Sequence, residues 1–164
     1  MRRVTFIGID PGSTGAVAVI DKGAVQFHDT PTLQVKGRRV IHTGKCADIL
    51  LGLPADSLVM IERSQPMPKN GSIACFGLGY SFGVWVGILA ACGFKWLLVR
   101  PQEWKKLLLP KDRQAGDKDQ SRDIAVQLYP LAEYHLERVM DHNRAEALLI
   151  AEYGRRVTFN GTVL

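Results

Sequence analysis

The stretch Ile7-Gly8-Ile9-Asp10-Pro11-Gly12-Ser13-Thr14-Gly15-Ala16 decides the fold, because it sets one acidic residue between an apolar segment and a tight turn. Apolar, largely β-branched residues lead up to Asp10 and predict a buried strand. The Pro-Gly pair after Asp10 and the glycine three residues further on predict the turn, and the chain then returns as the second strand of a hairpin. A carboxylate buried at such a strand end costs free energy unless it has a partner, and a metal cation would offset that cost.

The size and charge of the chain narrow the class of protein. Its 164 residues and 46% apolar content predict one globular domain, residues 1–156, followed by a C-terminal tail, residues 157–164. The net charge of +5 and the isoelectric point of about 9.3 favour a polyanionic partner. The same charge also fits a soluble protein with a slightly basic surface.

The cysteines and apolar runs argue against several other classes. Cys46, Cys75 and Cys92 have no CxxC spacing, so we expect neither a disulfide framework nor a zinc knuckle, but three buried thiols in a reducing compartment. The longest apolar run, residues 82–92, is too short for a membrane span, so no membrane partner is expected. Because the N-terminus leads directly into a predicted strand, we expect no signal or transit peptide in it. We expect the cytoplasm or nucleoid of a bacterium or phage-infected cell, or an organelle stroma if a transit peptide has been removed.

The order of elements predicts the architecture. Three strands, Val4–Asp10, Gly15–Ile20 and Ala24–His28, form an antiparallel meander, and the basic segment Thr30–Thr43 is expected to be a loop. Two further strands and five helices then alternate: strands Leu58–Glu62 and Phe94–Arg100, and helices Gly44–Leu53, Ile73–Cys92, Pro101–Leu108, Gln120–Tyr129 and Asn143–Tyr153. This order predicts an α/β fold, a ribonuclease H-like mixed five-stranded sheet with helices on both faces.

Four acidic residues are placed to meet at one end of this sheet. Asp10 and Glu62 each end an apolar strand, while Asp141 and Glu146 lie near the start of the last helix. Carboxylates that converge repel one another, and divalent cations neutralise them. Oxygen ligands of this kind favour Mg²⁺ or Mn²⁺ over zinc, and two such ions about 4 Å apart would support phosphodiester hydrolysis. Taken singly, each residue also fits a turn former or a helix cap.

The sequence resembles the RuvC-type Holliday junction resolvases, most closely their chloroplast branch with its phage and bacterial relatives. The matching blocks follow one another over nearly the whole chain: Gly8-Ile9-Asp10-Pro11-Gly12-Ser13-Thr14-Gly15-Ala16, Ile61-Glu62-Arg63-Ser64-Gln65-Pro66-Met67-Pro68-Lys69-Asn70-Gly71, Gly77-Leu78-Gly79-Tyr80 with Trp85-Val86-Gly87-Ile88-Leu89, and Asp141-His142-Asn143-Arg144-Ala145-Glu146-Ala147-Leu148-Leu149-Ile150-Ala151. The second and last blocks together make the resemblance specific.

The resemblance implies a homodimeric, Mg²⁺-dependent endonuclease that resolves four-way DNA junctions by symmetric paired nicks, with Mn²⁺ as a possible substitute and no nucleotide cofactor. Asp10, Glu62 and Glu146 take the metal-ligand positions. Bacterial members have Asp or His three residues before the last carboxylate, where this chain has Asn143. The fourth ligand is therefore assigned to Asp141, and His142 to a further ligand or a proton donor for the leaving group.

The resemblance also implies which residues face DNA. In the family, the loop after the second carboxylate enters the junction centre; its counterparts here are Arg63, Gln65, Met67, Lys69 and Asn70. Bacterial members have a Phe at the position of Gln65. The start of a later helix suits phosphate contacts through its N–H groups and through Lys118, Ser121 and Arg122. A proline-stiffened loop and a solvated charged turn are the simpler interpretations of these two segments.

Several aromatic side chains are expected to pack rather than to bind. Tyr80 is interpreted as a core residue, with base stacking as the alternative. Residues recurring at helical spacing form either core or dimer interface, and two tryptophans are expected to pack: Phe82, Trp85, Val86 and Leu89 in the first group, Trp96 and Trp104 in the second. Two other functions stay open, a nuclease of the same fold that acts on RNA or RNA–DNA hybrids and a non-catalytic junction-binding protein.

Overall fold

A computed structural model describes residues 4–65, 70–110 and 118–159. Its main sheet has the strand order β3-β2-β1-β6-β7. The strands β1 (Phe6–Asp10), β2 (Ala16–Asp21) and β3 (Ala24–Asp29) form the predicted antiparallel meander. The strands β6 (Leu58–Glu62) and β7 (Lys95–Val99) extend the sheet in parallel from β1, which confirms the predicted mixed sheet.

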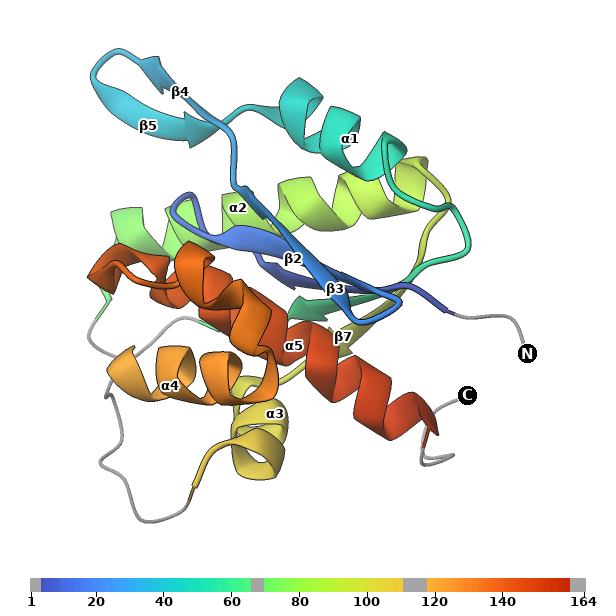
Figure 1. The fold of residues 1–164 in the computed structure, drawn as a ribbon. Helices are drawn as coiled ribbons and strands as arrows, with labels where there is room; N and C mark the ends of the chain where they lie inside the picture. Colours follow the sequence, from blue (N-terminus) through green and yellow to red (C-terminus); the bar gives the residue numbers. More distant parts are fainter. Residues whose placement is uncertain (1–3, 66–69, 111–117, 160–164) are drawn as a thin grey trace.

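Helices cover both faces of this sheet, as predicted (Figure 1). The helices α1 (Thr43–Leu51) and α2 (Ser72–Ala91) lie on one face, and α5 (His142–Phe159) lies on the other, flanked by α3 (Pro101–Leu108) and α4 (Lys118–Leu128). Two short 3-10 turns, Pro130–His135 and Val139–Asp141, connect α4 to α5. The last helix continues to Phe159, so residues 157–159 belong to α5 and not to the predicted tail.

Alternation along the strands decides which face each side chain occupies. Ile7 and Ile9 pack with Trp85 of α2 in one apolar cluster, whereas Phe6 and Met60 pack against α5 in the other. Asp10 and Glu62 have the same parity as Phe6 and Met60. Both carboxylates therefore emerge at the ends of adjacent parallel strands, on the face that α5 covers.

The contact between β1 and α5 is unusually close because Gly8 has no side chain. A Cβ atom at Gly8 would lie 2.0 Å from the carbonyl oxygen of Ala147 and 2.5 Å from the backbone nitrogen of Ala151. Such distances forbid any larger residue without a shift of the helix. Gly8 thus allows the backbone of α5 to rest directly on β1, one residue beyond Glu146.

The segment between β3 and α1 is a second small sheet, and the prediction of a loop over Thr30–Thr43 was wrong. The strands β4 (Thr32–Val35) and β5 (Arg38–Ile41) form an antiparallel hairpin. Lys36 and Gly37 connect them with φ angles of 48° and 77°. Two successive positive φ values in a two-residue connection match the twist of the flanking strands. Figure 1 shows this hairpin projecting from the body of the molecule beside α1.

The helix α2 is long and apolar, yet most of it is exposed. By length and composition it is a candidate membrane span, and 17% of its apolar window is buried. One such helix is weak evidence for a membrane, since core helices of soluble proteins meet the same criterion. Its 20 residues nevertheless differ from the prediction that every apolar run is too short to span a membrane. Tyr80 was predicted to be core and is instead 46% exposed. Cys46 is buried as predicted, whereas Cys75 and Cys92, near the two ends of this helix, are partly exposed.

Candidate active site

Three carboxylates interact where β1, β6 and α5 meet. Burial, together with the negative charges of Glu146 and Glu62, raises the pKa of Asp10 to about 7. Burial also raises the pKa of Glu62, with Glu146 adding to the effect. The backbone N–H of Gly12 donates to Asp10 Oδ1 at 3.4 Å and opposes the rise only in part. The sequence prediction that these carboxylates come together is therefore supported by their mutual electrostatic effect.

Helix α3 supplies polar partners to the two glutamates. The indole N–H of Trp104, a fully buried side chain, donates to Glu62 Oε2 at 2.7 Å. The ammonium of Lys105 lies 3.6 Å from Glu146 Oε1 and 5.0 Å from the centre of the Trp104 ring. Both partners favour the charged form of Glu62, and Lys105 also lowers the pKa of Asp10. Trp104 was expected to serve only for packing, and apolar periodicity gives no sign of what its N–H contacts.

The donor set suits a divalent cation chemically. Asp10, Glu62 and Glu146 offer hard oxygen ligands, and burial with the two neighbouring carboxylates raises the pKa of Asp10 although Lys105 opposes the rise. Within the ranges that the structure describes, no group of three or more His, Cys, Asp or Glu side chains is already arranged to hold a metal ion. Trp104 and Lys105 occupy the glutamates instead, so a cation would compete with Lys105 for Glu146.

The structure places Asp141 in an ion-pair network rather than with these carboxylates, which corrects its assignment as the fourth ligand. Its side chain is buried, and its oxygens accept hydrogen bonds from the backbone and guanidinium of Arg138 at 2.8–3.2 Å. The Nη1 atom of Arg144, three residues after Asp141, lies 3.6 Å from Asp141 Oδ1. Burial alone would raise the pKa of Asp141, but the hydrogen bonds and charges of the arginines hold it below its usual range. Asp141 closes the turn before α5.

Two neighbours of Asp141 also bond to backbone. The Nδ1 atom of His142 lies 3.0 Å from the carbonyl oxygen of Val139, within the same turn. The Asn143 side chain donates its Nδ2 to the carbonyl oxygen of Thr14 at 2.6 Å. Asn143 thereby ties the start of α5 to the turn that follows Asp10. The position three residues before Glu146 thus contacts the turn after Asp10, and its side chain acts here as a brace.

The residues predicted to face DNA divide into three groups. Arg63 and Gln65 are exposed and Asn70 is half-buried, as a DNA-facing loop requires, whereas Met67 and Lys69 lie outside the described residues. The prediction for Ser121 was wrong, because this residue is only 3% exposed at the first turns of α4.

The guanidinium of Arg122 likewise turns inward. It donates to the carbonyl oxygens of Leu136 and Glu137 at 3.4 and 2.9 Å, and it also pairs with Asp119. These bonds hold the connection between α4 and α5 and occupy the group that was predicted to contact phosphate. The backbone of Lys118 starts α4, and its side chain lies outside the described part of the structure.

Comparisons with known proteins agree with the resemblance seen in the sequence. No family model matches the chain. Over 136 residues it is 29% identical to the Holliday junction resolvase MOC1, chloroplastic, of Chlamydomonas reinhardtii, a match that covers 76% of this chain and 15% of that protein's length. In fold it is similar to T. thermophilus RuvC in complex with Holliday junction substrate, with a TM-score of 0.66, 16% identity and 97% of both chains covered. A second Thermus thermophilus RuvC structure gives a TM-score of 0.64 at 19% identity, over 97% of this chain and 98% of that one.

Proposed function

We propose that this protein is a metal-dependent endonuclease that resolves four-way DNA junctions by paired nicks. The observation that carries the proposal is the group of three carboxylates, Asp10, Glu62 and Glu146, at the ends of two parallel strands and the helix that covers them. Burial of Asp10 and the negative charges of the two glutamates together raise its pKa to about 7, a situation that divalent cations relieve. The similarity to a junction resolvase in sequence and to RuvC in fold supports the choice of substrate.

Each residue of the site has a separate role in this proposal. Asp10, Glu62 and Glu146 would hold two Mg²⁺ ions, which when bound activate water and stabilise the leaving oxygen in phosphodiester hydrolysis. Trp104 orients Glu62 through its N–H, so that one oxygen of this carboxylate stays free of that bond. Lys105 keeps a positive charge beside Glu146, where an incoming phosphate would experience it. Asn143 anchors the turn after Asp10 to α5.

The decisive experiment compares wild type with Asp10→Asn on a synthetic four-way junction in Mg²⁺. Asp56→Asn, which removes an exposed carboxylate between α1 and β6, is the matched control. We expect wild type and the control to cut two opposing strands at symmetric positions, and Asp10→Asn to bind the junction without cutting it. Unlinked nicks at unrelated positions, or no cutting by wild type, would refute junction resolution.

The alternative activities are separated by substrate in the same assay. Cleavage of an RNA–DNA hybrid with the junction left intact would identify a nuclease of the other class. Junction binding by wild type with no cutting in Mg²⁺ or Mn²⁺ would identify a non-catalytic binding protein. Specific junction cleavage that Asp10→Asn abolishes excludes both.

The proposal includes a homodimer, because two symmetric nicks on opposing strands call for two active sites. Sedimentation of wild type alone and on the junction tests this directly, with two chains per junction expected. A mature organellar protein and a bacterial or phage protein both fit the proposed activity, and the curated relative in Chlamydomonas is chloroplastic.

A further inference from the structure

A pocket of about 290 Å³ lies beside the C-terminal half of α5, where α4 ends and the chain turns from β2 to β3. Its lining residues come from all three places: Ile20, Gly23, Leu128, Tyr129, Glu152, Arg155 and Arg156. Ile20 pairs with Phe6, whereas Asp10 at the other end of β1 pairs with Ala16. The pocket is therefore separate from the candidate active site, and no described residue that was predicted to face DNA lines it.

A buried carboxylate fixes the orientation of two arginines in this pocket. Glu152 is 1% exposed, and its oxygens accept hydrogen bonds from Arg155 at 2.6 and 2.8 Å and from Arg156 at 2.7 Å. The hydroxyl of Tyr129 donates to the same carboxylate at 2.6 Å. Burial alone would raise the pKa of Glu152, but the hydrogen bonds from these three side chains hold it below its usual range. Glu152 is thus charged, and both guanidinium groups are held at one turn's spacing around it.

The two arginines retain positive charge and hydrogen-bond donors after this pairing. Two guanidinium groups against one carboxylate leave an excess of one positive charge. Among the residues that the structure describes, both Nη atoms of Arg156 and the Nη1 atom of Arg155 have no hydrogen-bond partner. The arginine side chains are 35–40% exposed, while the carboxylate of Glu152 lies beneath them. An occupant of the pocket therefore meets guanidinium donors rather than the carboxylate, which favours an oxyanion.

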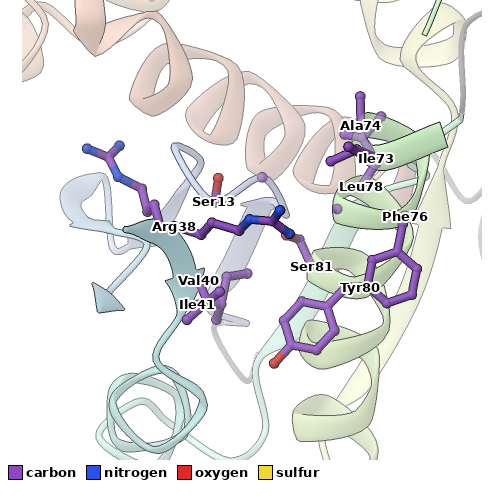
Figure 2. A pocket seen from close by; sticks show the side chains of 13 residues that line it. Ser13, Arg38, Val40, Ile41, Ile73, Ala74, Phe76, Leu78, Tyr80 and Ser81 are labelled. Atoms are coloured by element: carbon purple, nitrogen blue, oxygen red, sulfur yellow. The ribbon is translucent and has the colours of Figure 1, made fainter. Parts of the chain in front are cut away.

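The larger pocket between the β4–β5 hairpin and α2 has a different chemistry (Figure 2). Its volume is about 370 Å³, and exposed apolar side chains such as Ile73 and Phe76 line its helix side. Figure 2 shows them on α2, across the pocket from Arg38. Exposed apolar side chains are typical of contacts between proteins, whereas a small pocket with fixed guanidinium groups is typical of an anion site.

We propose that the pocket beside α5 binds a phosphate group, held by the free N–H groups of Arg155 and Arg156. The phosphate belongs either to the backbone of a junction arm or to free phosphate, because guanidinium groups recognise the same oxygens in both. Six residues separate Glu146 from Glu152, so this phosphate lies about 9 Å or more along α5 from the candidate active site. It is therefore distinct from the phosphate that would be cut, and the inference goes beyond the proposed function.

A substitution at the edge of the pocket tests the proposal without disturbing Glu152. Gly23 has a φ angle of 84°, and a Cβ atom there would meet no atom within 4 Å. Asp and Asn both tolerate this left-handed conformation, so Gly23→Asp and Gly23→Asn differ only in charge. Gln26→Glu changes the net charge equally at an exposed residue of the same hairpin that does not line the pocket.

A second variant acts on the guanidinium groups themselves. Arg156→Gln removes one of them and leaves Glu152 with its bonds from Arg155 and Tyr129. Thermal unfolding in chloride confirms that each variant is folded before its binding is measured.

The first measurement is calorimetric titration with sodium phosphate, against sodium chloride at equal ionic strength. We expect wild type, Gly23→Asn and Gln26→Glu to bind phosphate alike. Gly23→Asp and Arg156→Gln should bind it at least about 10-fold more weakly, because each removes one positive charge from the balance within a few ångströms of the anion.

The second measurement identifies the source of the phosphate. Junction affinity is measured in EDTA over a range of salt concentrations. A slope of log affinity against log salt that is lower by about 1 in Gly23→Asp and Arg156→Gln than in Gln26→Glu assigns the pocket to the DNA backbone, even if free phosphate does not bind measurably. Phosphate binding with equal slopes in all variants assigns the pocket to free phosphate.

The inference is overturned if wild type takes up phosphate no better than chloride and the salt slopes are also equal. It is overturned as well if Gly23→Asp binds phosphate as tightly as Gly23→Asn and matches its slope on the junction. Failure of the proposed function gives a different result. Wild type would then neither bind nor cut the junction, while the calorimetric titration would still show phosphate binding that Gly23→Asp weakens.

Discussion

Replacing Asp10 by Asn is expected to stabilise the metal-free protein at alkaline pH. The pKa of this carboxyl is 3.8 in a model compound and about 7 in the folded chain, first because of burial and then because of Glu146 and Glu62. Since the folded state binds the proton more tightly, the stabilisation from protonated Asp10 is fully present below pH 4, declines as the pH rises, and is lost above pH 7. At about 1.4 kcal/mol for each pH unit between the two pKa values, the full loss is about 4 kcal/mol.

The assay is urea denaturation in EDTA at pH 4.5 and pH 8, with Asp56→Asn as the control. Asn cannot be charged, so Asp10→Asn avoids the cost that wild type bears at pH 8. We expect the variant to exceed wild type by about 4 kcal/mol at pH 8 and by about 1 kcal/mol at pH 4.5. Carboxylates outside the cluster of Asp10, Glu62 and Glu146 titrate equally in both proteins, so the difference between them isolates this cluster. Identical pH dependence in wild type and Asp10→Asn would refute the electrostatic account of the site.

Magnesium provides the complementary arm of this experiment. A cation that binds only the folded state stabilises it by about 2.7 kcal/mol at a concentration 100 times its dissociation constant. We expect Mg²⁺ to raise the stability of wild type at pH 8 and to leave Asp10→Asn nearly unchanged, so that the gap between them narrows. Equal stabilisation of both proteins by Mg²⁺ would place the cation elsewhere.

Three further substitutions test how the site is built. Gly8→Ala is expected to destabilise the fold by at least about 3 kcal/mol in urea, because its Cβ would meet the backbone of α5, whereas Gly87→Ala, with open space around it, should add about 1 kcal/mol through helix propensity. Lys105→Gln is expected to raise the pKa of Asp10 above 7, measured by carboxyl ¹³C NMR, and an unchanged pKa would show that this ammonium does not act on the site. Trp104→Phe removes the N–H bonded to the carboxylate at the end of β6 and should cost about 1.5–3 kcal/mol at pH 8, with stability equal to wild type as the contrary result.

Strand parity explains why the central part of the site was predictable. Asp10 and Glu62 each end a short strand of consecutive buried, largely apolar residues, and parallel neighbours in a sheet bring such residues to one edge. Glu146 lies in an apolar stretch of α5 and is only partly exposed, a setting that an acidic residue seldom takes without a partner. These signals are local in the sequence, while the pairing of β1 with β6 follows from the order of elements. What was not predictable is the role of Trp104, which depends on how α3 is oriented against β6.

The β4–β5 hairpin was missed because its surface composition outweighed its pattern. The segment is basic, includes Pro31 and buries little, all of which suggest a loop. The two-residue connection Lys36-Gly37 between alternating residues was the available signal, since glycine at the second position suits the positive φ values found there. A hairpin with few core contacts contributes little to folding, so hydrophobic periodicity alone understates it.

The assignment of Asp141 failed for a different physical reason. Arg138 and Arg144 lie three residues on either side of it, at the spacing that brings side chains together around one turn. A carboxylate held between two guanidinium groups has its charge already satisfied and needs no metal. Acidic residues near one another in sequence are therefore poor evidence for a shared site until the nearby cations are counted.

The number of nearby cations also explains why the carboxylates around Asp10 differ from Asp141. The burial of Asp10 and its two neighbouring carboxylates outweigh the single ammonium of Lys105, so the pKa of Asp10 stays high. The carboxylates cannot relieve their repulsion by moving apart freely, because the absence of a side chain at Gly8 seats the backbone of α5 directly on β1. Asn143 adds a second tie between α5 and the turn after Asp10. Backbone packing thus holds a group of like charges in place, and the repulsion among them is the physical basis on which we propose this edge of the sheet as a cation site.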